Sequence, residues 1–172
     1  MTSTILLSNF FLKMYVVLFS DDASQPQVLI AVQSGPKNKD LRSEVRRTWG
    51  HACRTLHSSW CTVIFVLGQF DPSFDPSLQT DLENEAQEHR DILQESFQDS
   101  YNNLTLKTIF ILKYYAQNSD TLGNKFLLKT DDDSFVQLEA LWDLAKSRIE
   151  KKSNNLIGKT TCFKKWSVLV HS

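Results

Sequence analysis

Residues 125–136 read KFLLKTDDDSFV, and this stretch decides how the rest of the chain is interpreted. The apolar residues 126–128 are typical of a buried strand, and three carboxylates, Asp131, Asp132 and Asp133, follow closely. Charged groups rarely stand in a row beside a core unless something neutralises them. Because side chains alternate along an extended chain, we expect Asp131 and Asp133 to point to the same side. Two such carboxylates suit Mg²⁺ or Mn²⁺, so the stretch predicts a metal-bridged diphosphate site.

A second interpretation of the same aspartates needs no ligand. Three acidic residues after a strand also form a solvated turn, in which Asp133 or Ser134 would be the N-cap of the next helix. The apolar spacing of Leu138, Leu141 and Ala145 predicts that helix. A lone Asp-x-Asp pattern is common, so other parts of the chain have to decide between the two interpretations.

Composition is typical of a globular domain with its own core. The chain has 172 residues, of which 41% are hydrophobic and 23% charged. A formal net charge of −1 gives no reason to expect nucleic acid or an anionic membrane surface as a partner. The cysteines are Cys53, Cys61 and Cys162, without the spacing of a zinc site. Cys53 and Cys61 are close enough to be bridged in an oxidising compartment, and reduced buried thiols are the alternative.

Apolar periodicity predicts strands that alternate with helices. The expected strands are at residues 28–32, 62–68 and 126–128, and the expected helices at 41–49, 79–94, 101–117 and 138–149. On the helix at 101–117 we expect Leu104, Thr108, Leu112 and Tyr115 to face inward. This alternation is typical of an α/β fold with a mainly parallel sheet flanked by helices. Ligands of such sheets collect at the carboxyl ends of the strands, where the aspartates would lie.

Two further segments bear on function. Arg42 and Arg46 lie four positions apart on the first predicted helix, where they either grip a diphosphate or are ordinary surface arginines. Residues 5–19 form an interrupted apolar run, shorter than the roughly 20 residues that span a bilayer, and no basic residue precedes it. The run is a marginal signal anchor, a damaged signal sequence or a β-rich segment packed on the domain, and we favour membrane targeting.

Three motifs resemble the β-1,3-galactosyltransferase family, the hexosyltransferases of glycosyltransferase family 31. They are RSEVRRTWG at residues 42–50, DIL at 91–93 with FQDSYNNLTLKT at 97–108, and FLLKTDDDSFV at 126–136. The resemblance covers roughly residues 28–149. It implies a GT-A-like nucleotide-sugar transferase fold whose donor-binding half lies at 28–150, between an apolar segment with a linker at 1–27 and a divergent tail at 151–172.

The resemblance also implies a reaction and site residues. The chain would transfer a sugar from a UDP-sugar donor to a glycan or glycoprotein acceptor in protein glycosylation. Asp133 would bind Mn²⁺ (or Mg²⁺) directly, and Asp131 would bind the donor ribose or reach the ion through water. The other positions that match the donor pocket are Arg42, Arg46, Lys107 and Asp132.

Family members are membrane proteins on the lumenal side of the Golgi or ER. The apolar N-terminus and the glycosylation sequon at residues 103–105 agree with that location. Because the sequon lies in a predicted helix that buries Leu104 or Thr105, we expect low occupancy at Asn103.

One departure from the family pattern limits the expected activity. In the family, a second half follows the aspartates and supplies the acceptor wall and the carboxylate of the catalytic base, whereas no acidic residue follows Glu150 here. The chain resembles a truncated member, so we leave the base unassigned and expect little transfer from this chain alone. The alternatives are a non-catalytic binding fragment of such an enzyme and, last, a haloacid-dehalogenase-like phosphatase, which needs a further acidic pair.

Overall fold

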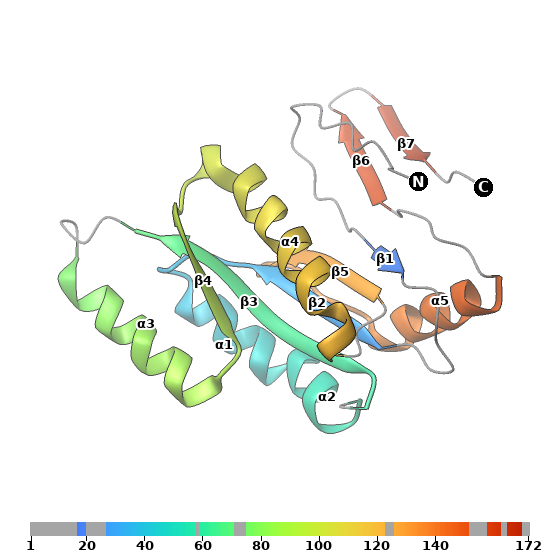
Figure 1. Ribbon diagram of the computed structural model, residues 1–172, viewed down its shortest axis with the longest axis horizontal. Helices are drawn as coiled ribbons and strands as arrows, with labels where there is room; N and C mark the ends of the chain where they lie inside the picture. The colour runs from blue at the N-terminus through green and yellow to red at the C-terminus, as the bar shows by residue number, and fades with distance from the viewer. Residues whose placement is uncertain are drawn as a thin grey trace.

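The computed structural model describes residues 17–19, 27–57, 59–70, 75–122, 126–151, 158–162 and 165–169. A five-stranded sheet forms its centre, in the spatial order β1-β5-β2-β3-β4 (Figure 1). Four of its strands are parallel, and β1 pairs antiparallel with β5. The strands are β1 (Val17–Phe19), β2 (Val28–Gln33), β3 (Cys61–Gln69), β4 (Ile92–Gln98) and β5 (Phe126–Asp131). The predicted α/β class with a mainly parallel sheet is confirmed.

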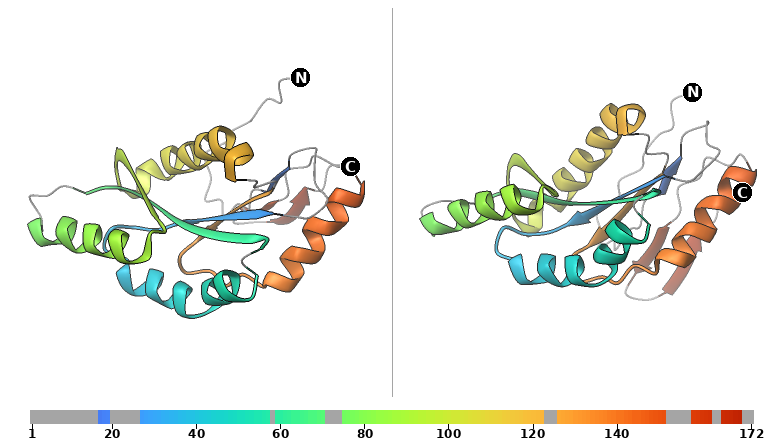
Figure 2. Two further views of the ribbon diagram at one scale, coloured as in Figure 1. Left: turned by 60° about the horizontal axis from the view of Figure 1, so that its bottom comes forward. Right: turned by 90° about the horizontal axis from the view of Figure 1, so that it is seen from below.

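Helices cover both faces of this sheet (Figure 2). They are α1 (Lys39–Arg47), α2 (Trp49–Thr55), α3 (Pro76–His89), α4 (Leu104–Leu122), which follows a 3₁₀ turn (Tyr101–Asn103), and α5 (Leu138–Lys151). Residues of α1, α2, α3 and α5 pack on one face in a cluster with Val28, Ile30 and Val32. Helix α4 covers the other face, where Ile111 and Tyr115 pack against the alternate residues of β2. All six residues of β2 are buried because both faces are covered, which explains its uninterrupted apolar sequence from Val28 to Val32.

The helix predicted at residues 79–94 is wrong at its C-terminal end. Helix α3 ends at His89, and Arg90 has a left-handed backbone with φ 53°. Strand β4 begins two residues later, so Leu93 lies in the sheet rather than on a helix. The strand has a half-buried alternating pattern and contains Gln, Glu and Ser, because it is an edge strand with one neighbour, β3. Because β4 contains polar residues, its sequence resembles a continuation of the amphipathic helix α3, and the strand was not predicted.

The inward stripe predicted for residues 101–117 is only partly correct. Among the α4 side chains that the structure describes, the buried ones are Lys107, Ile111 and Tyr115, whereas Leu104 is 40% exposed. Spacing of four residues is retained, but the buried face begins at a lysine instead of a leucine. A sequence rule that searches for apolar residues misses such a face.

The ends of the chain are described only in part. Residues 17–19 of the apolar N-terminal run form β1, and residues 1–16 lie outside the described residues. No helix within the described ranges has both the length and the apolar character needed to cross a bilayer. In the tail, β6 (Gly158–Cys162) and β7 (Lys165–Leu169) form an antiparallel pair, where the sequence had suggested no assignment.

Candidate functional site

The three aspartates lie at the carboxyl edge of the parallel strands. Asp131 is the last residue of β5 and stands opposite Gln33, the last residue of β2. The Asp132 amide still donates to Gln33 O at 3.1 Å, and the chain then turns, with Ser134 N donating to Asp131 O at 3.2 Å. We call residues 131–134 the acidic turn. Because the chain is not extended beyond Asp131, strand alternation does not place Asp133 beside Asp131 as we had argued.

Each carboxylate of the acidic turn has a different environment. Asp131 is half-buried, and alternation along β5 from Leu127 puts it on the α4 face of the sheet. Asp132 is also half-buried and accepts a hydrogen bond from Asn38 Nδ2 at 2.9 Å. Asp133 is exposed. The turn part of the ligand-free interpretation is correct, but its N-cap is wrong, because α5 begins only at Leu138.

The acidic turn offers oxygen ligands to a hard divalent cation whose remaining ligands would be phosphate and water. Among the described residues, no three His, Cys, Asp or Glu side chains converge as a ready-made metal cage. Mg²⁺ is ordinarily held by one or two carboxylates together with substrate phosphates and water, and Mn²⁺ shares its preference for oxygen ligands. Asp131 and Asp133 supply that number of carboxylates, so the residues present fit such an ion.

Arg42 lies under the site instead of facing a ligand. Its side chain is 1% exposed, and its Nε and Nη2 donate to the two carboxylate oxygens of Glu85 at 2.8 and 2.6 Å. Nη1 donates to Ser34 Oγ at 3.1 Å and to Gly35 O at 2.5 Å. The alternative of an ordinary surface arginine is therefore wrong for Arg42. A bidentate grip is present, but its partner is a carboxylate of α3.

Arg46 extends the same network. It donates to Glu85 Oε1 at 2.6 Å and to both carboxylate oxygens of Asp91, and Arg54 reaches Asp91 at 3.1 Å. Burial by itself would raise the pKa of Glu85, but hydrogen bonds and charge from Arg42 and Arg46 outweigh it and hold this pKa below its usual value. Burial by itself would lower the pKa of Arg46. Hydrogen bonds and charge from Asp91 and Glu85 outweigh this effect, so the Arg46 pKa is raised.

Lys107 is the third predicted cation, and it too is buried. Its Nζ donates to Ser34 O at 2.7 Å and to both oxygens of Asp99 at 3.0 and 2.9 Å. Asp99 also accepts from the Gly68 amide at 2.8 Å, which ties α4 to β3. The structure thus brings Arg42 and Lys107 to the loop that follows β2. Contact of Arg42, Arg46 or Lys107 with a nucleotide stays a prediction.

Sequence reasoning missed two residues of this region. Asn38 bridges to Asp132, and nothing in the sequence signals a contact across 94 positions. Lys129 lies two residues before Asp131 on the same face of β5 and is only 5% exposed. Burial lowers the Lys129 pKa, an effect that Asp131 opposes and Lys107 reinforces. A lysine between the apolar residues 126–128 and the aspartates was the signal that could have found it.

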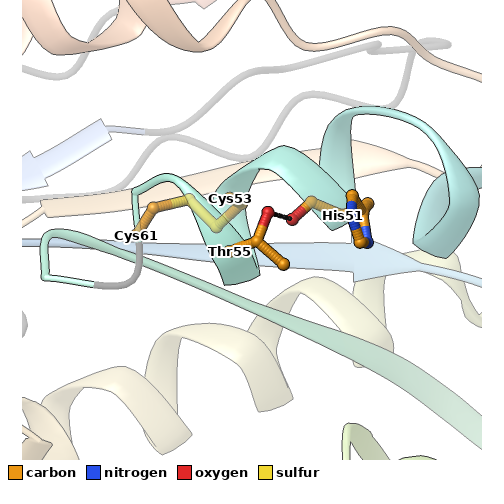
Figure 3. Close-up of a disulfide and its surroundings, with 4 residues drawn as sticks. All are labelled: His51, Cys53, Thr55 and Cys61. Atoms are coloured by element: carbon orange, nitrogen blue, oxygen red, sulfur yellow. Dashed lines mark hydrogen bonds between the residues drawn. A yellow bond between two sulfur atoms is a disulfide. The ribbon is translucent and has the colours of Figure 1, made fainter.

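The sequence left open whether Cys53 and Cys61 are bridged or reduced, and the structure shows the bridge. Cys53 of α2 and Cys61 of β3 form a disulfide with Cα atoms 5.4 Å apart (Figure 3). Figure 3 also shows Thr55 Oγ1 donating to His51 O, at 2.9 Å, within the same helix. Helix α2 is thereby fastened to the start of the adjacent strand.

The sequon is placed differently from the expectation. Asn103 ends the 3₁₀ turn and its Nδ2 donates to Gln98 O at 2.8 Å. Thr105 is exposed and Leu104 is 40% exposed. The prediction that one of them is buried, which was the reason for expecting low glycosylation at Asn103, is therefore wrong.

Comparison with known proteins adds an independent observation. The family model described as galactosyltransferase matches residues 40–172, including the tail. The chain is 35% identical over 122 residues to a human lactosylceramide 1,3-N-acetyl-beta-D-glucosaminyltransferase, covering 70% of this chain and 32% of the relative. It is 40% identical over 116 residues to mouse beta-1,3-galactosyltransferase 4, covering 67% and 29%. The chain therefore spans about a third of the length of these curated relatives.

Proposed function

This chain belongs to the galactosyltransferase family, and on that premise we propose that it forms the donor-binding part of a hexosyltransferase that uses a UDP-sugar. The observation that supports the proposal best is the acidic turn at the carboxyl edge of four parallel strands. Ligands of open α/β sheets bind at this edge. A GT-A-like donor half needs a group there that holds a nucleoside diphosphate.

The proposed ligands of the divalent ion are Asp131 and Asp133, with Mn²⁺ or Mg²⁺ as the ion. When bound, the ion would neutralise the diphosphate and the negative charge that develops on it as the sugar leaves. Asp131 lies on the α4 face and Asp133 is exposed to solvent. We propose that both carboxylates reach a ligand above the strand ends.

The basic residues have a supporting role in this proposal. Arg42 and Lys107 hold the loop after β2, and Arg46 neutralises Glu85 and Asp91 below it. Their hydrogen-bond donors are directed at carboxylates and carbonyls of the protein, so we do not assign them as primary phosphate ligands.

Acceptor and location belong to the proposal as well. We infer a β-1,3 linkage because the matched relatives are named as 1,3-transferases. From membership of the family we infer a glycan or glycoprotein acceptor. Residence on the lumenal side of the Golgi or ER membrane is supported by the Cys53–Cys61 disulfide, since disulfides persist in oxidising compartments. Anchoring through the N-terminal run remains a prediction.

The decisive experiment is a UDP titration of the folded chain in Mn²⁺ and, separately, in excess chelator. We expect binding only with the ion, and its loss in Asp133→Ala. Asp81→Ala is the matched control, because Asp81 is an exposed aspartate on α3. Equal UDP affinity in chelator, or unchanged affinity in Asp133→Ala, would overturn the proposal. Circular dichroism of each variant checks that it is folded.

A further inference from the structure

Asn38 precedes the first residue of α1, the position at which asparagine ordinarily caps a helix. Its side chain makes no capping hydrogen bond to α1. The amide Nδ2 instead donates to Asp132 Oδ2 at 2.9 Å, from a residue 94 positions away. A side chain well suited to a local contact is therefore used for a tertiary contact with the acidic turn. Departures of this kind from a local rule are expected at functional sites.

The loop that carries Asn38 is held from both faces of the sheet. On one face the buried Arg42 donates to Gly35 O at 2.5 Å, and on the other the buried Lys107 donates to Ser34 O at 2.7 Å. Both acceptors are backbone carbonyls, so these contacts set the path of the main chain. Asn38 is thus presented to Asp132 by a loop that two buried cations hold in place.

Asp132 is held through both its backbone and its side chain. Its backbone amide donates to Gln33 O at 3.1 Å, and its carboxylate accepts from Asn38. The Asp132 side chain is therefore retained toward α1, while Asp131 lies on the α4 face and Asp133 is exposed. This hydrogen bond selects one position of the Asp132 carboxylate in a turn where three adjacent carboxylates repel one another.

We propose that Asn38 is a positioning residue for the acidic turn. By retaining Asp132 toward α1, it leaves Asp131 and Asp133 preorganised for a divalent cation and the diphosphate that the cation carries. The inference rests on the function proposed above. It adds a residue outside the aspartates, acting through Asp132 without touching the ion.

Asn38→Ser separates this role from helix capping. Serine caps helices about as well as asparagine, but its side chain is too short to reach Asp132. We expect UDP affinity in Mn²⁺ to fall about 10-fold, as for other residues that orient metal ligands, while loss of the single Asn38–Asp132 hydrogen bond lowers the free energy of unfolding only slightly. Asn84→Ser, at an exposed position of α3, should leave both quantities unchanged. Asn38→Gly, also a good cap, serves if the serine variant does not fold.

The same titration in an Asp132→Ala background tests the route of the effect. If Asn38 acts through Asp132, adding Asn38→Ser to the Asp132→Ala variant should cause no further change in UDP affinity. Wild-type affinity in Asn38→Ser or Asn38→Gly, or an equal loss in the Asp132→Ala background, would overturn the inference alone. Absence of Mn²⁺-dependent UDP binding by the wild-type chain would overturn the proposed function, and the inference with it.

Discussion

Glu85 shows how one carboxylate can hold several elements together. Its side chain on α3 is 2% exposed and accepts from two arginines of α1. The pair Arg46 and Asp91 then connects α1 to the residue that precedes β4. A charge in this position is tolerated only because both of its oxygens are paired.

We predict that Glu85→Gln lowers the free energy of unfolding by about 3–5 kcal/mol at pH 7, because it leaves buried guanidinium charge uncompensated. Urea unfolding measures the difference. The matched control is Glu88→Gln, an exposed change on the same helix that should stay within about 0.5 kcal/mol of wild type.

The pH dependence of this difference follows from the lowered pKa of Glu85. A carboxyl whose pKa is depressed by folding stabilises the native state above its unfolded pKa, and the contribution is lost as pH falls through the folded pKa. The gap between wild type and Glu85→Gln should therefore be full at neutral pH and shrink at acid pH. A gap that widens on acidification would contradict this account of Glu85.

At the scale of elements, the connection between α2 and β3 can be tested directly, because a disulfide joins them in addition to their core packing. Cys53 and Cys61 are eight positions apart and both are buried. Cys53 is part of the core cluster beneath the sheet, together with Trp60 and Val45. The bridge thus fixes α2 against the beginning of β3.

Reduction of this disulfide should lower the free energy of unfolding by roughly 2–3 kcal/mol, the loop-closure value for a short loop. The measurement is denaturant unfolding with and without reductant. A double variant, Cys53→Ala with Cys61→Ala, should start near the reduced value and respond little to reductant. Equal stability of oxidised and reduced wild type would show that the bridge does not constrain the chain.

At the scale of the whole molecule, the site is assembled from segments distant in sequence. Strands β2 and β5 lie side by side in the sheet, although more than ninety positions separate their paired residues. Their carboxyl ends bring the loop with Asn38 beside the acidic turn. A ligand bound there should therefore report on the folding of the entire sheet.

We expect UDP with Mn²⁺, at about 100 times its Kd, to stabilise the native state by about 2.7 kcal/mol. For a chain of this length the melting temperature should rise by roughly 5–10 °C. Differential scanning calorimetry with UDP in chelator provides the control. A melting temperature that is equal in the two samples would argue against a preformed site at the strand ends.

The sequence by itself determined the layered α/β class, the strands β2, β3 and β5, and the position of the aspartates at a strand end. Each of these depends on local periodicity or on buried apolar runs, which can be recognised without knowing the partners. Strand β4 escaped because an edge strand keeps polar residues, and the buried face of α4 escaped because it begins at Lys107.

Only the tertiary structure decided the partners of the charged residues. Arg42 and Arg46 have the spacing of a phosphate grip, yet they pair with Glu85, which lies on another helix. Asn38 has the position of a cap, yet it binds Asp132. The physical reason is that a charged group or an amide can pair with any oppositely charged or hydrogen-bonding partner of suitable geometry. Which partner comes within 3 Å is set by how the strands are ordered in the sheet, and no local pattern encodes that order.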